Sequence, residues 1–236
     1  MVSPLDNPTC ASLNGAHARF AERHGQVMRY HPEVATFLAL PDRPDDRVWA
    51  DVAALAGPGA TVPMNSSFAP PAGWEVLGRV AGVQLVDVGV RAAEDAEAVR
   101  LGPRDVPEML ELVERTKPGP FLRRTVELGT YLGIRRDGAL VAMAGERLRP
   151  PGWTEISAVC TDPAHRGRGL ATRLVLAVAA GIRARGETPL MHAAASNTSA
   201  IRLYESLGFA LRKRTEFVML RVPEDADVAL RAGARS

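Results

Sequence analysis

The stretch Val159–Thr172 constrains this chain more than any other part of it. An apolar, strand-like run ends at Pro163, which cannot donate a hydrogen bond to a neighbouring strand. Gly167 and Gly169 follow, and a long run typical of a helix begins at Leu170. A glycine-rich turn before a helix exposes backbone N–H groups at the positive end of the helix dipole. The stretch therefore predicts a binding site for a phosphate or pyrophosphate group.

Composition and charge exclude several classes of function. With 236 residues, 46% of them hydrophobic, the chain can form one large domain or two small ones with a sizeable core. A net charge of +2, with both signs interspersed, gives no electrostatic reason to expect a nucleic-acid partner. No run of about 18 strongly apolar residues is present, so we expect no membrane-spanning helix and no membrane partner.

Cysteines and histidines do not form a recognisable metal motif. Cys10 and Cys160 lie far apart, and His17, His24 and His31 follow at intervals of seven residues. Neither spacing suits a metal site, so we expect no metal and interpret the three histidines as scattered surface residues. Two isolated cysteines and the absence of a signal-peptide pattern favour a reducing, cytoplasmic location.

The chain is expected to divide into two regions and a tail. Residues 1–90 contain helix-like and strand-like segments without a catalytic constellation, so we predict an N-terminal α/β region of unknown role there. It is either a degenerate repeat of the fold that follows or a cover that shapes an acceptor site. Residues 91–99 are interpreted as a linker or short helix, and residues 223–236 as a flexible tail.

Residues 99–222 carry clearer signals. The predicted order is a strand, two helices, three strands, a helix, a strand, a helix and two strands. Asp137–Gly138 between two apolar runs is typical of a two-residue hairpin turn. Gly186 and Gly208 are expected to end the last two helices. The pattern predicts a mixed α/β fold.

Two motifs in this region resemble those of the GNAT N-acetyltransferase superfamily. Arg166–Ala171 matches the family's Q/R-x-x-G-x-G/A pattern, and Asn197–Phe209 resembles its N-x-x-A-x-x-L-Y-x-x-x-G-F signature. The motifs come in the family's order, about 30 residues apart, and the resemblance covers about residues 99–222. It implies a GNAT-type central mixed sheet flanked by helices, to which the N-terminal α/β region is an addition.

The resemblance also implies acetyl-CoA as the cosubstrate and a small-molecule or peptide amine as the acceptor. The donor's pantetheine arm is expected to pair with the strand before the turn, and its pyrophosphate to bind the turn itself. By this resemblance the cofactor-binding residues are Val159, Cys160, Thr161, Arg166, Gly167, Arg168, Gly169, Leu170, Ala171, Thr172 and Asn197.

The same resemblance suggests catalytic roles. Tyr204 matches the family's general acid toward the leaving thiolate; the alternative is a packed tyrosine whose hydroxyl only bonds the thioester sulfur. Glu155 matches the general base of some members, with Glu146 or a chain of water molecules as alternatives. Cys160 is interpreted as a strand residue and not as a nucleophile, because direct transfer needs no acyl-enzyme.

The acceptor itself is not identified by these patterns. Residues 116–124 and Tyr131 are expected to form its wall, and Arg123 and Arg124 are either contacts for an acidic acceptor or solvated arginines. Two other classes of function stay open: an acyl-CoA-binding module without turnover, and an interaction protein dominated by its N-terminal half. The oligomeric state is not predicted.

Overall fold

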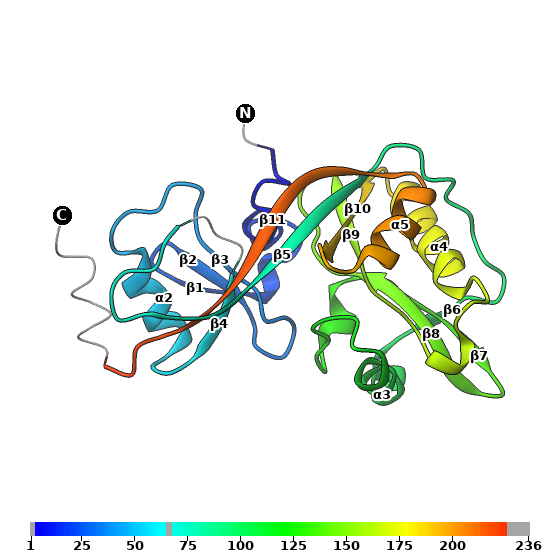
Figure 1. The fold of residues 1–236 in the computed structure, drawn as a ribbon, viewed down its shortest axis with the longest axis horizontal. Coiled ribbons are helices and arrows are strands. Elements are labelled where there is room, and N and C mark those ends of the chain that lie inside the picture. Colours follow the sequence, from blue (N-terminus) through cyan, green and yellow to red (C-terminus); the bar gives the residue numbers. More distant parts are fainter. Residues whose placement is uncertain (1–2, 65–67, 226–236) are drawn as a thin grey trace.

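The computed structural model describes residues 3–64 and 68–225. Within them the strands join one sheet of eleven, in the order β1-β2-β3-β4-β11-β5-β10-β9-β8-β7-β6 (Figure 1). The strands are β1 Ala21–His24, β2 Val27–Tyr30, β3 Leu38–Ala39, β4 Thr61–Met64, β5 Glu75–Asp87, β6 Val99–Leu101, β7 Tyr131–Arg136, β8 Ala139–Glu146, β9 Trp153–Thr161, β10 Thr188–Ala194 and β11 Phe209–Arg221. The α-helices are α1 Pro8–Leu13, α2 Val48–Ala56, α3 Val106–Thr116, α4 Leu170–Ala184 and α5 Thr198–Ser206. Short 3₁₀ helices are η1 Ala18–Phe20, η2 Pro103–Asp105, η3 Thr125–Leu128 and η4 Pro163–His165.

Local turn chemistry explains several of these boundaries. Asp137 and Gly138 both have positive φ, 50° and 83°, and connect β7 directly to β8. Two left-handed residues form the type I′ turn that suits a tight hairpin, so the predicted hairpin is confirmed. Gly186 and Gly208, at φ 76° and 102°, follow α4 and α5, where a left-handed residue commonly ends a helix.

The sheet runs without a break through both predicted regions. Strand β5, from the N-terminal region, pairs antiparallel with β10 on one side and β11 on the other. Strand β11 also pairs with β4, so the last strand of the chain lies between strands of the first region. Figure 1 shows β5 and β11 crossing together from one lobe of the molecule to the other. The predicted boundary at residues 91–99 lies between two strands of the same sheet.

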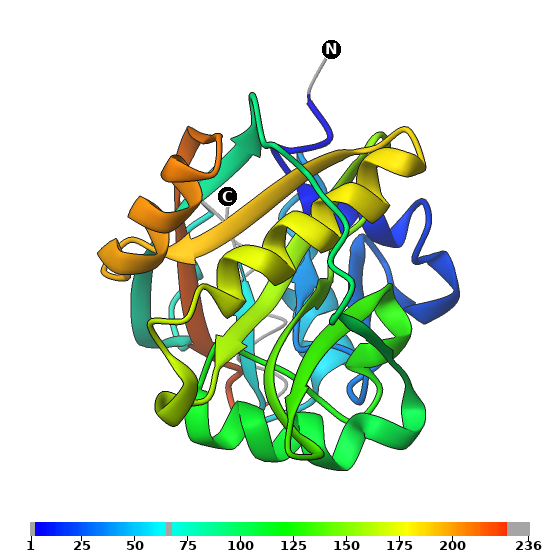
Figure 2. The same cartoon turned by 90° about the vertical axis from the view of Figure 1, so that its right-hand side faces the viewer.

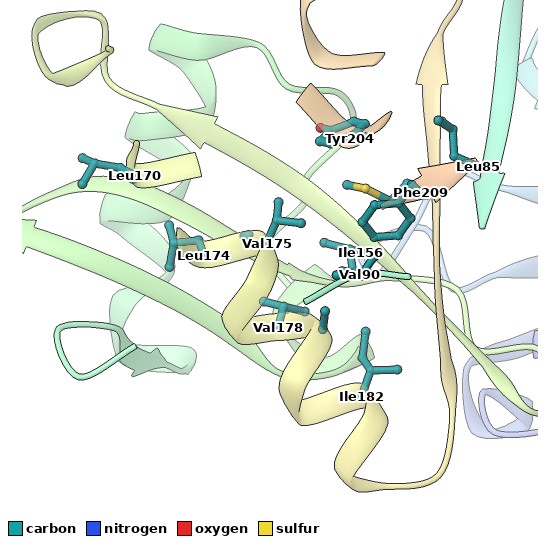
Figure 3. Packing of buried hydrophobic residues seen from close by; sticks show 14 of the residues in the cluster. Leu85, Val90, Ile156, Leu170, Leu174, Val175, Val178, Ile182, Tyr204 and Phe209 are labelled. Atoms are coloured by element: carbon teal, nitrogen blue, oxygen red, sulfur yellow. The ribbon is translucent and has the colours of Figure 1, made fainter. Parts of the chain in front are cut away.

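Helices α3 and α4 cover opposite faces of the central strands. Leu174, Val178 and Ile182 recur at helical spacing along α4 and pack in one buried cluster with Ala142 and other residues (Figure 3). A second cluster contains residues of α3 together with Met143, the neighbour of Ala142 on β8. Since successive strand residues point to opposite faces, the two clusters lie on the two sides of the sheet. Figure 2 shows α4 lying across these strands.

A bulge in strand β9 reverses which face of the sheet its alternate side chains point to. Met143 pairs with Cys160 but Gly145 pairs with Ser157, so β9 has one extra residue between these pairs. Ala158 lies in this bulge with φ 52°, an uncommon conformation for a residue with a Cβ. Consequently Ile156 belongs to the α4 cluster, whereas Ala158 and Cys160 belong to the α3 cluster, although simple alternation would place all three on one face.

The N-terminal region builds its core partly from the end of the chain. Trp49 and Trp74 pack edge to face at 5.0 Å and share a cluster with Val218, Leu220 and Val222. Val222 also accepts a backbone hydrogen bond from a residue of the first region. The predicted flexible tail, residues 223–236, lies outside the described residues from position 226 onward.

The interpretation of the histidines as surface residues is wrong for His17. Its side chain is buried, with Nδ1 2.9 Å from the Tyr30 hydroxyl and Nε2 3.1 Å from the Leu128 carbonyl. The ring thereby joins the first region to the turn before β7, which sequence spacing does not reveal. None of the helices within the described residues is both long and apolar enough to cross a membrane.

Candidate active site

Strands β9 and β10 separate in the middle of the sheet. Their parallel pairing runs from Trp153 and Thr188 to Ile156 and Met191, while β10 continues to pair with β5 as far as Ala194. Beyond that point residues 157–161 and 192–194 line a cavity of about 1020 Å³. The separation therefore leaves one edge of β9 open to a bound molecule.

The glycine turn closes one end of this cavity. Gly167 and Gly169 have φ of 75° and 73°, and Gly169 is the N-cap residue of α4. Within residues 3–64 and 68–225, the N–H groups of Gly167, Arg168, Gly169 and Leu170 donate to no protein acceptor. Free N–H groups at the start of a fifteen-residue helix form an anion-binding arrangement.

Most of the predicted cofactor-binding residues line the cavity. Arg168 does not: it is exposed and lies outside the lining. Those that do are Val159, Cys160, Thr161, Arg166, Gly167, Gly169, Leu170, Ala171, Thr172 and Asn197. Asn197 also caps α5, its Oδ1 accepting a hydrogen bond from the Ala200 N–H at 3.2 Å.

The cavity lining also contains polar atoms without partners in the part of the chain that the structure describes. Thr161 Oγ1 and His165 Nδ1 are buried without a hydrogen-bond partner among the described residues, and both residues line the cavity. Buried polar atoms normally have partners, so these two are available to a bound polar molecule.

Tyr204 lies where α5 meets the cavity. The residue is buried and packs edge to face on Phe209 at 6.4 Å (Figure 3). It also lines the cavity. Burial, with a smaller contribution from the nearby Cys160, raises the pKa of Tyr204 to about 12. The phenol is therefore protonated at neutral pH and can donate a hydrogen bond.

Cys160 has the character of a structural thiol. It is buried, and burial raises its pKa to about 11. Since the thiolate is the nucleophilic form, this environment disfavours a nucleophilic role, as the sequence analysis expects.

Glu155 does not line the cavity, although its partners Arg147 and His192 do. The residue is fully buried; its carboxylate accepts two hydrogen bonds from Arg147, at 2.6 and 2.9 Å, and has His192 Nδ1 at 2.8 Å. Burial by itself would raise the pKa of Glu155, but the charges of Arg147 and His192 outweigh it and hold that pKa far below its usual range. The geometry therefore does not favour the predicted role of Glu155 as general base.

The alternative base, Glu146, is placed similarly. It is buried, forms an ion pair with Arg185 at 3.0 Å and lies outside the cavity lining. Neither carboxylate lines the cavity.

The predicted acceptor wall is only partly present. Residues 116–120 line the cavity, whereas Phe121 and Tyr131 are buried against each other at 5.5 Å and do not. Arg124 forms ion pairs with Glu127 and Glu33, and Arg123 is exposed outside the lining.

Several lining residues were missed from the sequence. Phe37 and Pro63 come from the N-terminal region, Arg147 follows β8, and His192 and Phe217 belong to β10 and β11. None belongs to a recognisable motif. Long-range strand pairing brings these segments to the cavity: β3 with β4 and β4 with β11, β8 with β9, and β5 with β10 and β11.

Comparison with known proteins assigns the family. A family model described as FR47-like protein matches residues 131–218. A crystal structure of a protein from Novosphingobium aromaticivorans, assigned to the GNAT family of acetyltransferases, is 41% identical to this chain; the match covers 93% of this chain and 98% of that one, with a TM-score of 0.85. This chain belongs to the GNAT family. The predicted resemblance and the mixed α/β fold are thereby confirmed.

Other similarities are more local. A mycothiol acetyltransferase from Thermobispora bispora is 46% identical over 56 residues, which are 23% of this chain and 19% of that protein. The N-alpha-acetyltransferase RimI of Mycobacterium tuberculosis is 38% identical over 90 residues, 36% of this chain and 56% of that enzyme. The match thus spans about a fifth of the mycothiol acetyltransferase and just over half of RimI.

Proposed function

We propose that this GNAT protein transfers an acetyl group from acetyl-CoA directly to a primary amine. The observation that carries the proposal is the separation of β9 from β10, which places the open edge of β9, the glycine turn and Tyr204 around one cavity. The name of the relative RimI, an N-alpha-acetyltransferase, supports an amine as the acceptor.

In this proposal the donor lies along β9. Its pantetheine arm pairs with Val159, Cys160 and Thr161 in the manner of an added strand, and its pyrophosphate accepts hydrogen bonds from the free N–H groups of residues 167–170. Arg166 supplies a compensating charge at the same end of the cavity. Asn197 holds the start of α5 and so positions Tyr204.

The transfer needs no covalent intermediate on the enzyme. The neutral amine attacks the thioester carbonyl carbon, a C–N bond forms, and the C–S bond breaks as the tetrahedral intermediate collapses. The leaving thiolate takes a proton from the Tyr204 hydroxyl, which hydrogen-bonds to the sulfur as its negative charge develops. The nitrogen of the tetrahedral intermediate loses a proton to water in the cavity, and water returns a proton to the Tyr204 phenolate, so the products are the neutral amide and the CoA thiol. Because a phenol with a pKa of about 12 is a weak acid, the proton moves as the C–S bond breaks and not before it.

A proton must also leave the amine before it attacks. Glu155 and Glu146 are both held in buried ion pairs and do not line the cavity. We therefore assign the amine proton to water in the open cavity, and to Glu155 a positioning role through Arg147.

The test is release of CoA thiol from acetyl-CoA in the presence of amino acids, peptides, polyamines and aminoglycosides. Thermal stabilisation by acetyl-CoA is measured in parallel; at 100 times Kd it should reach about 2.7 kcal/mol. Stabilisation without thiol release across the panel would instead support a binding module, and absence of both would refute a donor site.

A further inference from the structure

The charges around the cavity are of one sign. Among the described residues that line it there is no aspartate or glutamate, whereas Lys117, Arg147 and Arg166 all contribute to it. Arg166 follows the end of β9, and the Arg147 N–H bonds the Glu155 carbonyl near the start of that strand. Thr161 and Glu155 are about 20 Å apart along β9, so Arg147 lies far from the donor turn.

Arg147 is held rigidly but keeps one nitrogen free. Its Nε and Nη2 donate to Glu155, and its guanidinium lies 4.9 Å from the Phe37 ring centre. Its side chain is 13% exposed and lines the cavity. Nη1 makes no hydrogen bond to any described residue, so a charged donor is available to a bound molecule.

Apolar side chains line much of the cavity that this donor borders, with Thr36 and His192 as polar residues in the same lining. Phe37, Pro63, Val80, Phe217 and Met219 line the same cavity. A smaller adjoining cavity of about 30 Å³ has Phe37, Pro63, Phe217 and Arg147 in its lining too. Within the smaller cavity Arg147 is the arginine among mostly apolar residues, with Thr9 and His192 as the polar ones.

We propose that Arg147 Nη1 binds the carboxylate of the acceptor, and that the acceptor class is short apolar peptides and related amino-carboxylates. This inference rests on the proposed function for the amine end of the acceptor. Glu155, which holds Arg147, marks the carboxylate end of the acceptor, and the Ala158–Cys160 segment, which lies near Tyr204, marks the amine end. These two points are about 10 to 16 Å apart along β9. At about 3.3–3.6 Å per extended residue, and allowing for the arginine side chain, two to four residues span this distance.

The same lining disfavours polycationic acceptors. Polyamines and aminoglycosides carry further ammonium groups, and the described lining offers them no carboxylate. A second ammonium group in this cavity would meet like charge from whichever of Lys117, Arg147 and Arg166 it approached.

The experiment compares acids with their amides. Glycyl-phenylalanine and glycyl-glycyl-phenylalanine, each as the free acid and as the C-terminal amide, are assayed as acceptors by thiol release. Binding of N-acetylglycyl-phenylalanine and its amide is measured by calorimetry on the full chain, with and without CoA, because this readout needs no turnover. We expect the acid to be preferred by about 10- to 100-fold, mainly in KM and Kd.

Two variants test whether Arg147 causes the preference for the acid over the amide. Arg147→Lys keeps a positive charge beside Glu155 but removes the free Nη1, so the acid-to-amide ratio should approach one. The double variant Arg147→Gln with Glu155→Gln removes both buried charges together and should have the same effect if the lysine variant folds poorly. Arg149→Lys is the matched control, because Arg149 pairs with Glu187 at 2.8 Å and does not line the cavity; it should keep the ratio.

The outcomes separate this inference from the proposed function. Equal use and equal binding of acid and amide by the natural protein would overturn the carboxylate site, and so would a ratio that Arg147→Lys leaves unchanged. Preferential binding of the acid without thiol release from any amine would refute the transferase but retain the carboxylate site.

Discussion

Arg147 and Glu155 form a paired hydrogen bond, Nη2 to Oε1 at 2.6 Å and Nε to Oε2 at 2.9 Å, with Glu155 fully buried. His192 Nδ1 lies 2.8 Å from Oε1, and the Leu148 N–H donates to Oε2 at 3.3 Å. Each carboxylate oxygen of Glu155 thus has two hydrogen-bond partners within the protein. The pair therefore fixes the guanidinium next to the cavity and leaves no oxygen for an incoming proton.

Replacement of Glu155 by Gln is expected to act first on stability. It leaves the Arg147 charge buried without its partner, and loss of one member of a buried pair typically costs about 3–5 kcal/mol. Urea unfolding measures this change, with exposed Glu205→Gln on α5 as the control. An unfolding free energy close to that of the natural protein, together with a kcat lowered at least 100-fold, would instead point to Glu155 as the base.

Tyr204→Phe is expected to lower kcat by about 10²–10⁴ while acetyl-CoA binding changes little. The hydroxyl acts on the leaving thiolate, a charge absent from the bound ground state. Turnover is measured by thiol release and donor binding by thermal shift. Unchanged turnover would leave Tyr204 as a packing residue only.

Gly169→Ala tests the donor turn. A Cβ at φ 73° costs about 1–2 kcal/mol, and the change should also weaken acetyl-CoA binding, because the N–H groups of residues 167–170 must keep their direction. Gly138→Ala is the matched control, with φ 83° and open space around its Cβ, in the hairpin between β7 and β8. Both should lose similar stability, but only Gly169→Ala should raise the Kd for acetyl-CoA; an equal Kd for the two would contradict the assigned turn.

His17 should make the protein sensitive to acid. Burial lowers the pKa of His17 from 6.5 to about 4, so above pH 6.5 its ring is neutral in both folded and unfolded chains. As the pH falls from 6.5 to about 4, the unfolded chain takes up the proton first, and about 3 kcal/mol of stability is lost. Unfolding free energies between pH 7 and pH 4 measure this, and the His17→Gln variant should show a shallower dependence. Parallel curves for the two proteins would rule out His17 as the source.

Local signals predicted the donor half of the site. Gly167 and Gly169 need left-handed backbone, and the start of α4 exposes N–H groups whatever the rest of the chain does. The Asp137–Gly138 turn likewise depends on only two residues. Such features are local in sequence, so the sequence by itself determined them.

Only the tertiary structure decided the part of the site around Arg147 and the bulge in β9. The sequence around Ala158 does not predict a bulge. Its left-handed backbone is imposed by β8, which pairs with Ser157 before it and with Cys160 after it. Arg147, Glu155 and His192 come from three neighbouring segments, and their contact depends on the order of β8, β9 and β10 in the sheet. Because Glu155 is fully buried among them, its charge is compensated by Arg147 and His192 and not by water. Glu155, which the family resemblance suggests as a base, is buried in an ion pair with Arg147, because long-range strand pairing, and not local propensity, sets which groups lose water.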